Sequence, residues 1–149
     1  MKFKQLAENI YISTQINEDD IAPMQQLGIK TVICHRFDNE ENEQPGFEEL
    51  AAKMRAAGIP NTHYQPIAAK AGVPEVNADT ATTLERILNE CEKPVLMFCK
   101  TGARSCAAWS ILQAGKGISP EELIQKAAEC ERNIAALQPV LQEAFASSK

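Results

Sequence analysis

Long apolar runs are missing from this 149-residue sequence, and no stretch of it is long enough to span a bilayer. The amino terminus, residues 1–6, lacks the apolar core of a signal peptide. Basic residues are in the minority, with 15 Lys and Arg against 20 Asp and Glu and a net charge of -5, which argues against nonspecific nucleic-acid binding. Nothing resembles a linker or an internal repeat. We therefore expect a cytoplasmic protein that binds neither membranes nor nucleic acid, with residues 1–149 in a single domain.

Potential metal ligands are scarce. The two histidines, His35 and His63, have no ligand spacing with each other or with the cysteines, so we predict no metal site and no cofactor. The five cysteines, at positions 34, 91, 99, 106 and 130, are odd in number and irregularly spaced. This pattern favours a reduced compartment over a disulfide framework.

Residues 94–110 carry the most informative pattern, which is a short apolar strand, a tight loop and a helix. Val95–Phe98 is too short for a helix and follows a proline, which favours a buried strand of a parallel sheet. A loop from Cys99 to Arg104 comes next, and Ser105–Ala114 is expected to form a helix that packs back onto the sheet. This order places Cys99 at the carboxyl end of a strand, facing the amino terminus of a helix.

A loop of this kind is typical of an anion site. Its backbone N–H groups point inward and add to the positive end of the helix dipole; the loop residues between the cysteine and the arginine are Lys100, Thr101, Gly102 and Ala103. Gly102 lets the chain turn at positive φ. Arg104 can close the ring with a bidentate grip on a tetrahedral oxyanion.

The same positive field acts on the thiol of Cys99. Helix amino termini and nearby cations favour the thiolate, so we predict that Cys99 is a nucleophile. Ser105 is placed to hydrogen-bond the sulfur and to stabilise it as a leaving group. Lys100 and Thr101 point out of the loop in most such sites and are candidates for selecting the substrate.

The rest of the chain alternates strands and helices. The expected strands are Ile10–Ser13, at an edge, Lys30–His35 and Thr62–Ile67, the last followed by a loop rich in Ala, Gly and Pro. The expected helices are one capped by Asp19 or Asp20 that ends before Gly28, then Phe47–Ala57, about Ala78–Glu92, a helix capped by Ser119 that runs to about Arg132, and Ile134–Phe145. The alternation predicts an α/β fold with a mostly parallel central sheet flanked by helices, and ligands at the carboxyl ends of its strands.

Several of these segments match a known pattern when they are taken together. They are Leu27–Ile33, Gly58–Ile59, Tyr64–Ile67, Pro94–Cys99 and Gly102–Ser105. In this order they resemble small dual-specificity-type protein phosphatases, and more closely the bacterial phosphatase-like domains related to those fused to beta-lactamase-like hydrolases. The resemblance runs from about Ile10 to the carboxyl-terminal helices.

The resemblance implies a protein-tyrosine-phosphatase-like fold and a small anionic or phosphorylated substrate. In that family the cysteine attacks phosphorus and forms a phosphocysteine, which would be the role of Cys99. Residues 100–103 and Arg104 would hold the phosphoryl oxygens. Ser105 would assist the departure of the thiolate.

The chain departs from the phosphatase pattern at three places. Only four residues separate Cys99 from Arg104 where phosphatases usually have five, Phe98 stands where a histidine is common, and Ala68–Lys70 takes the place of the usual acidic donor. The shorter loop also resembles that of rhodanese-type sulfurtransferases, in which the cysteine carries a persulfide. A catalytically inactive domain that binds an anion or a partner is the third interpretation.

Other polar residues are secondary candidates. Asp38 follows the strand that ends at His35 and is the candidate general acid, although an aspartate in so polar a stretch is more often part of a solvated loop. Glu75 and Asp79 are weaker acid candidates. For Arg36 we expect a surface ion pair, and for His35 a satisfied residue at a strand end.

Two further cysteines are candidates for redox chemistry. Cys34 and Cys106 are placed to resolve an oxidised or persulfidated Cys99, although core packing is favoured for both. Trp109 is expected to be a core anchor. The oligomeric state is not predicted.

Overall fold

The computed structural model describes residues 2–148, which form two compact units. The first, here called the sheet unit, comprises the chain up to Pro66 together with Cys91–Gly102. The second, the helical unit, comprises Ile67–Glu90 and the chain from Ala103 onward.

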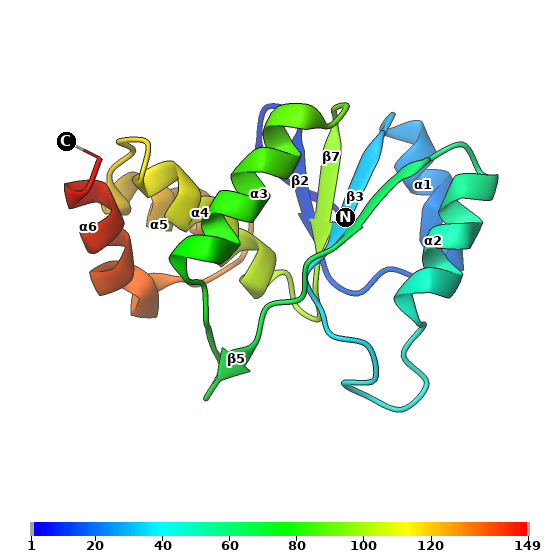
Figure 1. Cartoon of the computed structure of the whole chain (residues 1–149), viewed down its shortest axis with the longest axis horizontal. Helices are drawn as coiled ribbons and strands as arrows, with labels where there is room; N and C mark the ends of the chain where they lie inside the picture. Colours follow the sequence, from blue (N-terminus) through cyan, green and yellow to red (C-terminus); the bar gives the residue numbers. More distant parts are fainter. Residues whose placement is uncertain (1, 149) are drawn as a thin grey trace. The chain divides into compact units, whose positions relative to one another are not determined.

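The sheet unit is built on five strands in the order β1-β2-β7-β3-β4, of which β2, β7 and β3 are labelled in Figure 1. The strands are β1 (Lys4–Ala7), β2 (Ile10–Ser13), β3 (Thr31–Cys34), β4 (Asn61–Tyr64) and β7 (Val95–Phe98). β2, β7, β3 and β4 are parallel, whereas β1 pairs antiparallel with β2. All four residues of β3 and of β7 are buried, as expected for inner strands of a parallel sheet. The predicted α/β fold with a mostly parallel sheet is confirmed.

The helices of the sheet unit bury an apolar stripe against these strands. They are the short 3-10 helix Glu18–Asp20, α1 (Ile21–Gln26) and α2 (Phe47–Ala56). The stripe of α2 includes Leu50, Ala51 and Met54, spaced as one helical face requires. These residues belong to one core cluster with side chains of α1 and of the inner strands, among them Met24, Val32, Leu96 and Phe98.

The amino-terminal part of the sheet unit differs from the prediction in two ways. β2 is not an edge strand, because β1 precedes it and covers its free side. β1 gives little sequence signal, since it has four residues and only Leu6 is buried. The first helical turn is capped by Asn17, whose side chain accepts the N–H of Asp19 and whose N–H donates to Asp20. Asp20 therefore closes a capping box from inside the turn.

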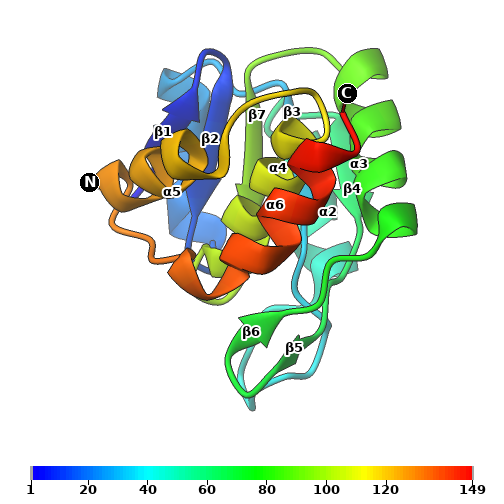
Figure 2. The same ribbon diagram turned by 90° about the vertical axis from the view of Figure 1, so that its left-hand side faces the viewer.

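The helical unit is organised around α4 (Ala103–Ala114), which contacts α3 (Ala78–Glu90), α5 (Pro120–Glu129) and α6 (Gln138–Ala146) (Figure 2). Ten of the twelve residues of α4 are buried, so it has no polar face. Trp109 is among them, as expected of a core anchor.

Two boundaries near the middle of the chain were predicted incorrectly. β4 ends at Tyr64 rather than at Ile67, although Gln65 still donates its N–H to Cys34 O at 2.8 Å; Pro66, which follows, has no N–H for the ladder. The expected loop after it contains a small hairpin, β5 (Ala69–Lys70) and β6 (Val73–Pro74). Its central residues, 71 and 72, both have positive φ, as a type I′ turn requires.

The remaining helices follow the prediction with shorter ends. Ser119 Oγ accepts the N–H of Glu122 at 3.3 Å, which confirms the predicted cap of α5, but the helix stops at Glu129. The expected helix from Ile134 is a 3-10 turn, Ala135–Leu137, that leads into α6 with Pro139 in its first turn. Within residues 2–148, no helix combines the length and apolarity that crossing a membrane would require.

Candidate functional site

Cys99 lies at the carboxyl end of β7, between the ends of two parallel neighbours. Its N–H donates to Ser13 O at 3.4 Å, on the β2 side. On the β3 side, His35 donates its N–H to Phe98 O at 2.8 Å. Cys99 is buried, and the backbone at this strand end is hydrogen-bonded on both flanks.

The sulfur of Cys99 accepts a hydrogen bond from the loop that follows it. The N–H of Gly102 lies 3.1 Å from Cys99 Sγ, and both residues are buried. Gly102 has a φ of 91°, a conformation that side-chain-bearing residues rarely adopt. The loop therefore turns back on itself so that a backbone amide donor faces the sulfur.

The first residue of the loop is tied to both neighbouring strand ends. Lys100 O accepts the N–H of Gln15, which follows β2, at 3.4 Å. Lys100 Nζ lies 3.7 Å from Glu41 Oε1 in the loop after β3. The side chains of Lys100 and Glu41 are half-exposed, and Thr101 is exposed, so the outer side of the loop is charged and open to solvent.

A buried arginine next to this loop corrects the prediction for Arg36. The expected ion pair is present, with Glu40 and Glu41, but Arg36 itself is only 2% exposed and does not lie on the surface. Its Nε donates to Glu40 Oε1 at 2.9 Å, its Nη1 donates to Gln15 Oε1 at 2.9 Å, and its Nη2 donates to Glu41. The available signal was an arginine at a strand end with glutamates four and five positions later, in a stretch interpreted as a solvated loop.

The other predicted site residues, Arg104 and Ser105, belong to the helical unit, in the first turn of α4. Ala103, the first residue of α4, follows Gly102 directly in the chain. Arg104 is buried and its Nη1 donates to Ile67 O at 3.0 Å, so its guanidinium is not turned toward bulk solvent. The hydroxyl of Ser105 is buried and has no hydrogen-bond partner within residues 2–148.

Asp38, the predicted general acid, has a structural contact. Its Oδ1 accepts the N–H of Phe47 at 2.9 Å, which caps the start of α2, and its own N–H donates to Tyr64 Oη at 3.0 Å. The residue itself is exposed. Its assignment as a general acid stays a prediction.

His35, directly after β3, is fully buried, and its Nδ1 lies 2.9 Å from Gln65 O. The weaker acid candidates, Glu75 and Asp79, are exposed residues of the helical unit. The cap of α3 is Asn77, which accepts the N–H of Thr80 at 2.8 Å.

The two candidate resolving cysteines are both buried. Cys34 is in register with Phe98, and both side chains belong to the core cluster on the α1 and α2 face of the sheet. Because successive strand residues point to opposite faces, Cys34 does not share a face with the residue after Phe98. Its Sγ donates to Arg36 O at 3.3 Å. Cys106 lies in α4, and its redox role stays a prediction.

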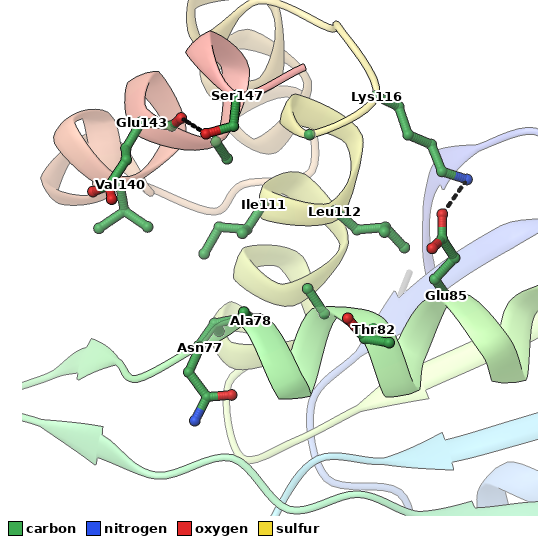
Figure 3. Close-up of a pocket in the computed structure, with 14 residues that line it drawn as sticks. Asn77, Ala78, Thr82, Glu85, Ile111, Leu112, Lys116, Val140, Glu143 and Ser147 are labelled. Carbon is green, nitrogen blue, oxygen red and sulfur yellow. Dashed lines mark hydrogen bonds and ion pairs between the residues drawn. The ribbon is translucent and has the colours of Figure 1, made fainter. Parts of the chain in front are cut away.

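A separate cavity of about 500 Å³ lies in the helical unit, between α3, α4 and α6 (Figure 3). Its walls include Ile111, Leu112 and Val140, and at one end Lys116 Nζ lies 3.4 Å from Glu85 Oε2. None of the site residues predicted from the sequence lines it.

The pKa of His63, a side chain of the sheet unit, departs from its usual value. Burial lowers the pKa of His63, on β4, below its usual value of 6.5, because the charged imidazolium is less well solvated there.

The parallel sheet, with a cysteine loop at the carboxyl end of an inner strand and a helix directly after it, has the fold of the protein-tyrosine-phosphatase-like domains. Residues 2–116 match the phosphatase-like domain of the beta-lactamase hydrolase-like proteins, and the chain belongs to this family.

Known relatives agree with this assignment. A beta-lactamase hydrolase-like protein of Xylella fastidiosa is 27% identical over 117 residues, which are 78% of this chain and 26% of that protein. A counterpart in Agrobacterium fabrum is 26% identical over the same length. The chain thus spans about a quarter of the length of the curated relatives it matches.

The solved structures show the same fold. A candidate phosphatase of Neisseria meningitidis is 33% identical, with a TM-score of 0.89 over 97% of this chain and 99% of its own. The human tyrosine phosphatase-like serine/threonine/tyrosine-interacting protein is 21% identical, with a TM-score of 0.70 over 97% of this chain and 95% of its own, and shares the fold.

Proposed function

We propose that this chain hydrolyses phosphate monoesters with Cys99 as the nucleophile. The observation that carries the proposal is the hydrogen bond of 3.1 Å from the Gly102 N–H to Cys99 Sγ, because it aims a backbone donor of the loop at the sulfur, at the carboxyl end of a strand. Membership in a phosphatase-like family supports the same chemistry.

The proposed reaction has two displacements at phosphorus. In the first, the Cys99 thiolate attacks phosphorus, a sulfur–phosphorus bond forms, and the bond to the ester oxygen breaks with protonation of the leaving alcohol. In the second, water attacks phosphorus, the sulfur–phosphorus bond breaks, and inorganic phosphate leaves as the thiolate is restored.

Each remaining site residue has a role in this proposal. The amides of residues 100–103 and the guanidinium of Arg104 stabilise the nonbridging oxygens as charge develops on them. The Ser105 hydroxyl donates to the sulfur as it leaves phosphorus. Asp38 is the candidate donor of the proton to the leaving alcohol.

Sulfur transfer is the second candidate, and the four-residue spacing between Cys99 and Arg104 favours it. In that reaction the thiolate takes the outer sulfur of thiosulfate, the sulfur–sulfur bond of thiosulfate breaks, and sulfite leaves. The Cys99 persulfide then gives its outer sulfur to cyanide, which yields thiocyanate and restores the thiolate. No proton donor for a leaving alcohol is needed.

To distinguish the two reactions, the protein is incubated with an aryl phosphate and, in a separate sample, with thiosulfate. Mass spectrometry then identifies any covalent adduct on Cys99. Under the proposal, phosphate is released without sulfur uptake, and Cys99→Ser lowers turnover by at least about 1,000-fold because the nucleophile is lost. Cys91→Ser is the control, since Cys91 lies outside the loop, and it should retain turnover.

Other outcomes have definite meanings. Persulfide formation with thiocyanate production supports sulfur transfer, and retained phosphatase turnover in Cys99→Ser overturns the assignment of the nucleophile. If neither substrate reacts and Cys99 alkylates no faster than a model thiol at neutral pH, the chain is an anion- or partner-binding domain.

A further inference from the structure

Arg36 is a buried cation with three separate side-chain acceptors. It is 2% exposed at the end of β3, and its guanidinium donates to Glu40, Gln15 and Glu41 from three different nitrogens. Burying a charge is costly unless it is paired and hydrogen-bonded. A planar guanidinium holds several acceptors in fixed directions, which a lysine ammonium does not do.

Two of the three acceptors connect to the Cys99 loop. Gln15 accepts from Arg36 Nη1 through its side chain, while its backbone N–H donates to Lys100 O at 3.4 Å. Glu41 accepts from Arg36 Nη2 and lies 3.7 Å from Lys100 Nζ. Arg36 thus reaches the backbone and the side chain of the residue after Cys99, each through one intermediate residue.

These connections bear on where the loop amides point. Lys100 is the first residue of the Cys99 loop, and the loop turns back within three residues to bring the Gly102 N–H to the sulfur. A change in the position of Lys100 O would therefore change the direction of the amides that follow it. Of the two glutamates, Glu41 lies 3.7 Å from Lys100 Nζ, and Glu40 accepts from Arg36 Nε at 2.9 Å.

We propose that Arg36 is a positioning residue for the Cys99 loop, which it holds through Gln15 and Glu41 so that the loop amides converge on one anion. This inference deepens the proposed function and rests on the loop being its anion site. Arg36 does not contact the substrate in this proposal, and its effect passes through Lys100.

The test compares Arg36→Met with Arg55→Met in the full chain. Arg55 is an exposed residue of α2, so the control makes the same chemical change outside the network. The probes are inorganic phosphate affinity and the NMR resonance of the Gly102 amide. We expect Arg36→Met to weaken phosphate binding by about tenfold to a hundredfold and to shift that resonance, with Arg55→Met unchanged, because small misplacements in a site have large effects.

Two milder variants keep the test decisive if Arg36→Met is unstable. Arg36→Lys keeps the charge and should restore phosphate affinity only in part. Gln15→Met removes one of the three acceptors and leaves Arg36 paired with both glutamates, and should also shift the Gly102 resonance. If the folded variants match Arg55→Met in phosphate affinity and in the Gly102 signal, the proposal is overturned.

The result is distinguishable from failure of the proposed function, because neither probe needs turnover. If Arg36→Met shifts the Gly102 resonance but the unmodified chain hydrolyses no phosphate ester, Arg36 is a positioning residue and the phosphatase reaction is excluded. If the resonance is unchanged in Arg36→Met and the unmodified chain is an active phosphatase, the positioning role is excluded and the phosphatase reaction stands.

Discussion

The Cys99 loop and the cavity of the helical unit organise polar groups in different ways. At the loop, side chains from separate strand ends converge, since Arg36 joins Gln15 and Glu41 and both contact Lys100. In the cavity the walls are largely apolar, and the ion pair of Lys116 with Glu85 is half-exposed at one end. The comparison teaches that a buried cation with acceptors from several strand ends marks a candidate site of chemistry better than the size of a hollow does.

The largest effect that sharpens this comparison concerns the two cores. Met54 in the sheet unit and Leu141 in the helical unit are both fully buried. Met54→Ala and Leu141→Ala should each lower the free energy of unfolding by about 2–5 kcal/mol, because each leaves a cavity. Urea unfolding would follow Trp109, the single tryptophan, for the helical unit and amide exchange of β3 for the sheet unit.

If residues 1–149 fold as a single domain, both variants shift both probes equally. Separate transitions would contradict that expectation. Met54→Leu is the control, and it should cost less than about 1.5 kcal/mol because volume is conserved.

A smaller effect distinguishes the Cys99 loop from an ordinary turn. Gly102 and Gly72 have φ values of 91° and 79°, so an alanine at either position should cost about 1–2 kcal/mol of stability. Only Gly102→Ala should also weaken inorganic phosphate binding, because it moves the amide that donates to Cys99. Calorimetric titration with phosphate measures the difference, and equal affinities in the two variants would refute the loop as an anion site.

Two lysines provide a finer comparison of the loop with the cavity. Lys100→Ala should weaken phosphate binding by about fivefold at most, because its side chain is half-exposed and already near Glu41. The loss should diminish as salt is added. Lys116→Ala removes a similar exposed charge from the cavity and should leave phosphate affinity unchanged. A loss of affinity in Lys116→Ala would show that the cavity takes part in anion binding.

The smallest effect is a pH dependence within the sheet unit. The pKa of His63 is lowered by burial from 6.5, so below pH 6.5 the unfolded chain binds more protons than the folded one. The free energy of unfolding should therefore fall as the pH drops from 6.5 toward the lowered pKa of His63 in the folded chain. Above pH 6.5, the stabilisation that comes from the neutral imidazole should be fully present. At about pH 7.5, His63→Gln and the unmodified chain should unfold at the same urea concentration. At about pH 5.5, His63→Gln should unfold at a higher urea concentration than the unmodified chain. Equal behaviour at both pH values would contradict the shift.

Much of the fold was accessible from local patterns. The β7 strand, the α2 helix and the Ser119 cap of α5 were predicted because apolar spacing and capping residues act over a few positions. The strand β1 and the hairpin β5–β6 were not predicted, because they are short, polar or exposed and are defined by pairing with a partner strand.

The sequence predicts only part of the candidate site. Cys99, Gly102 and Arg104 follow from one contiguous motif. Arg36 was assigned to the surface, since an arginine before a run of glutamates has the composition of a solvated loop. Its burial depends on Gln15, which follows another strand, and no local pattern reports that contact.

The sequence by itself determined the strand, turn and helix around Cys99, because steric limits at glycine and apolar spacing are properties of neighbouring residues. Tertiary structure decided which distant groups support that turn. Strand order places the ends of β2, β7 and β3 side by side. The buried guanidinium of Arg36 donates to the acceptors that this order brings within hydrogen-bond distance.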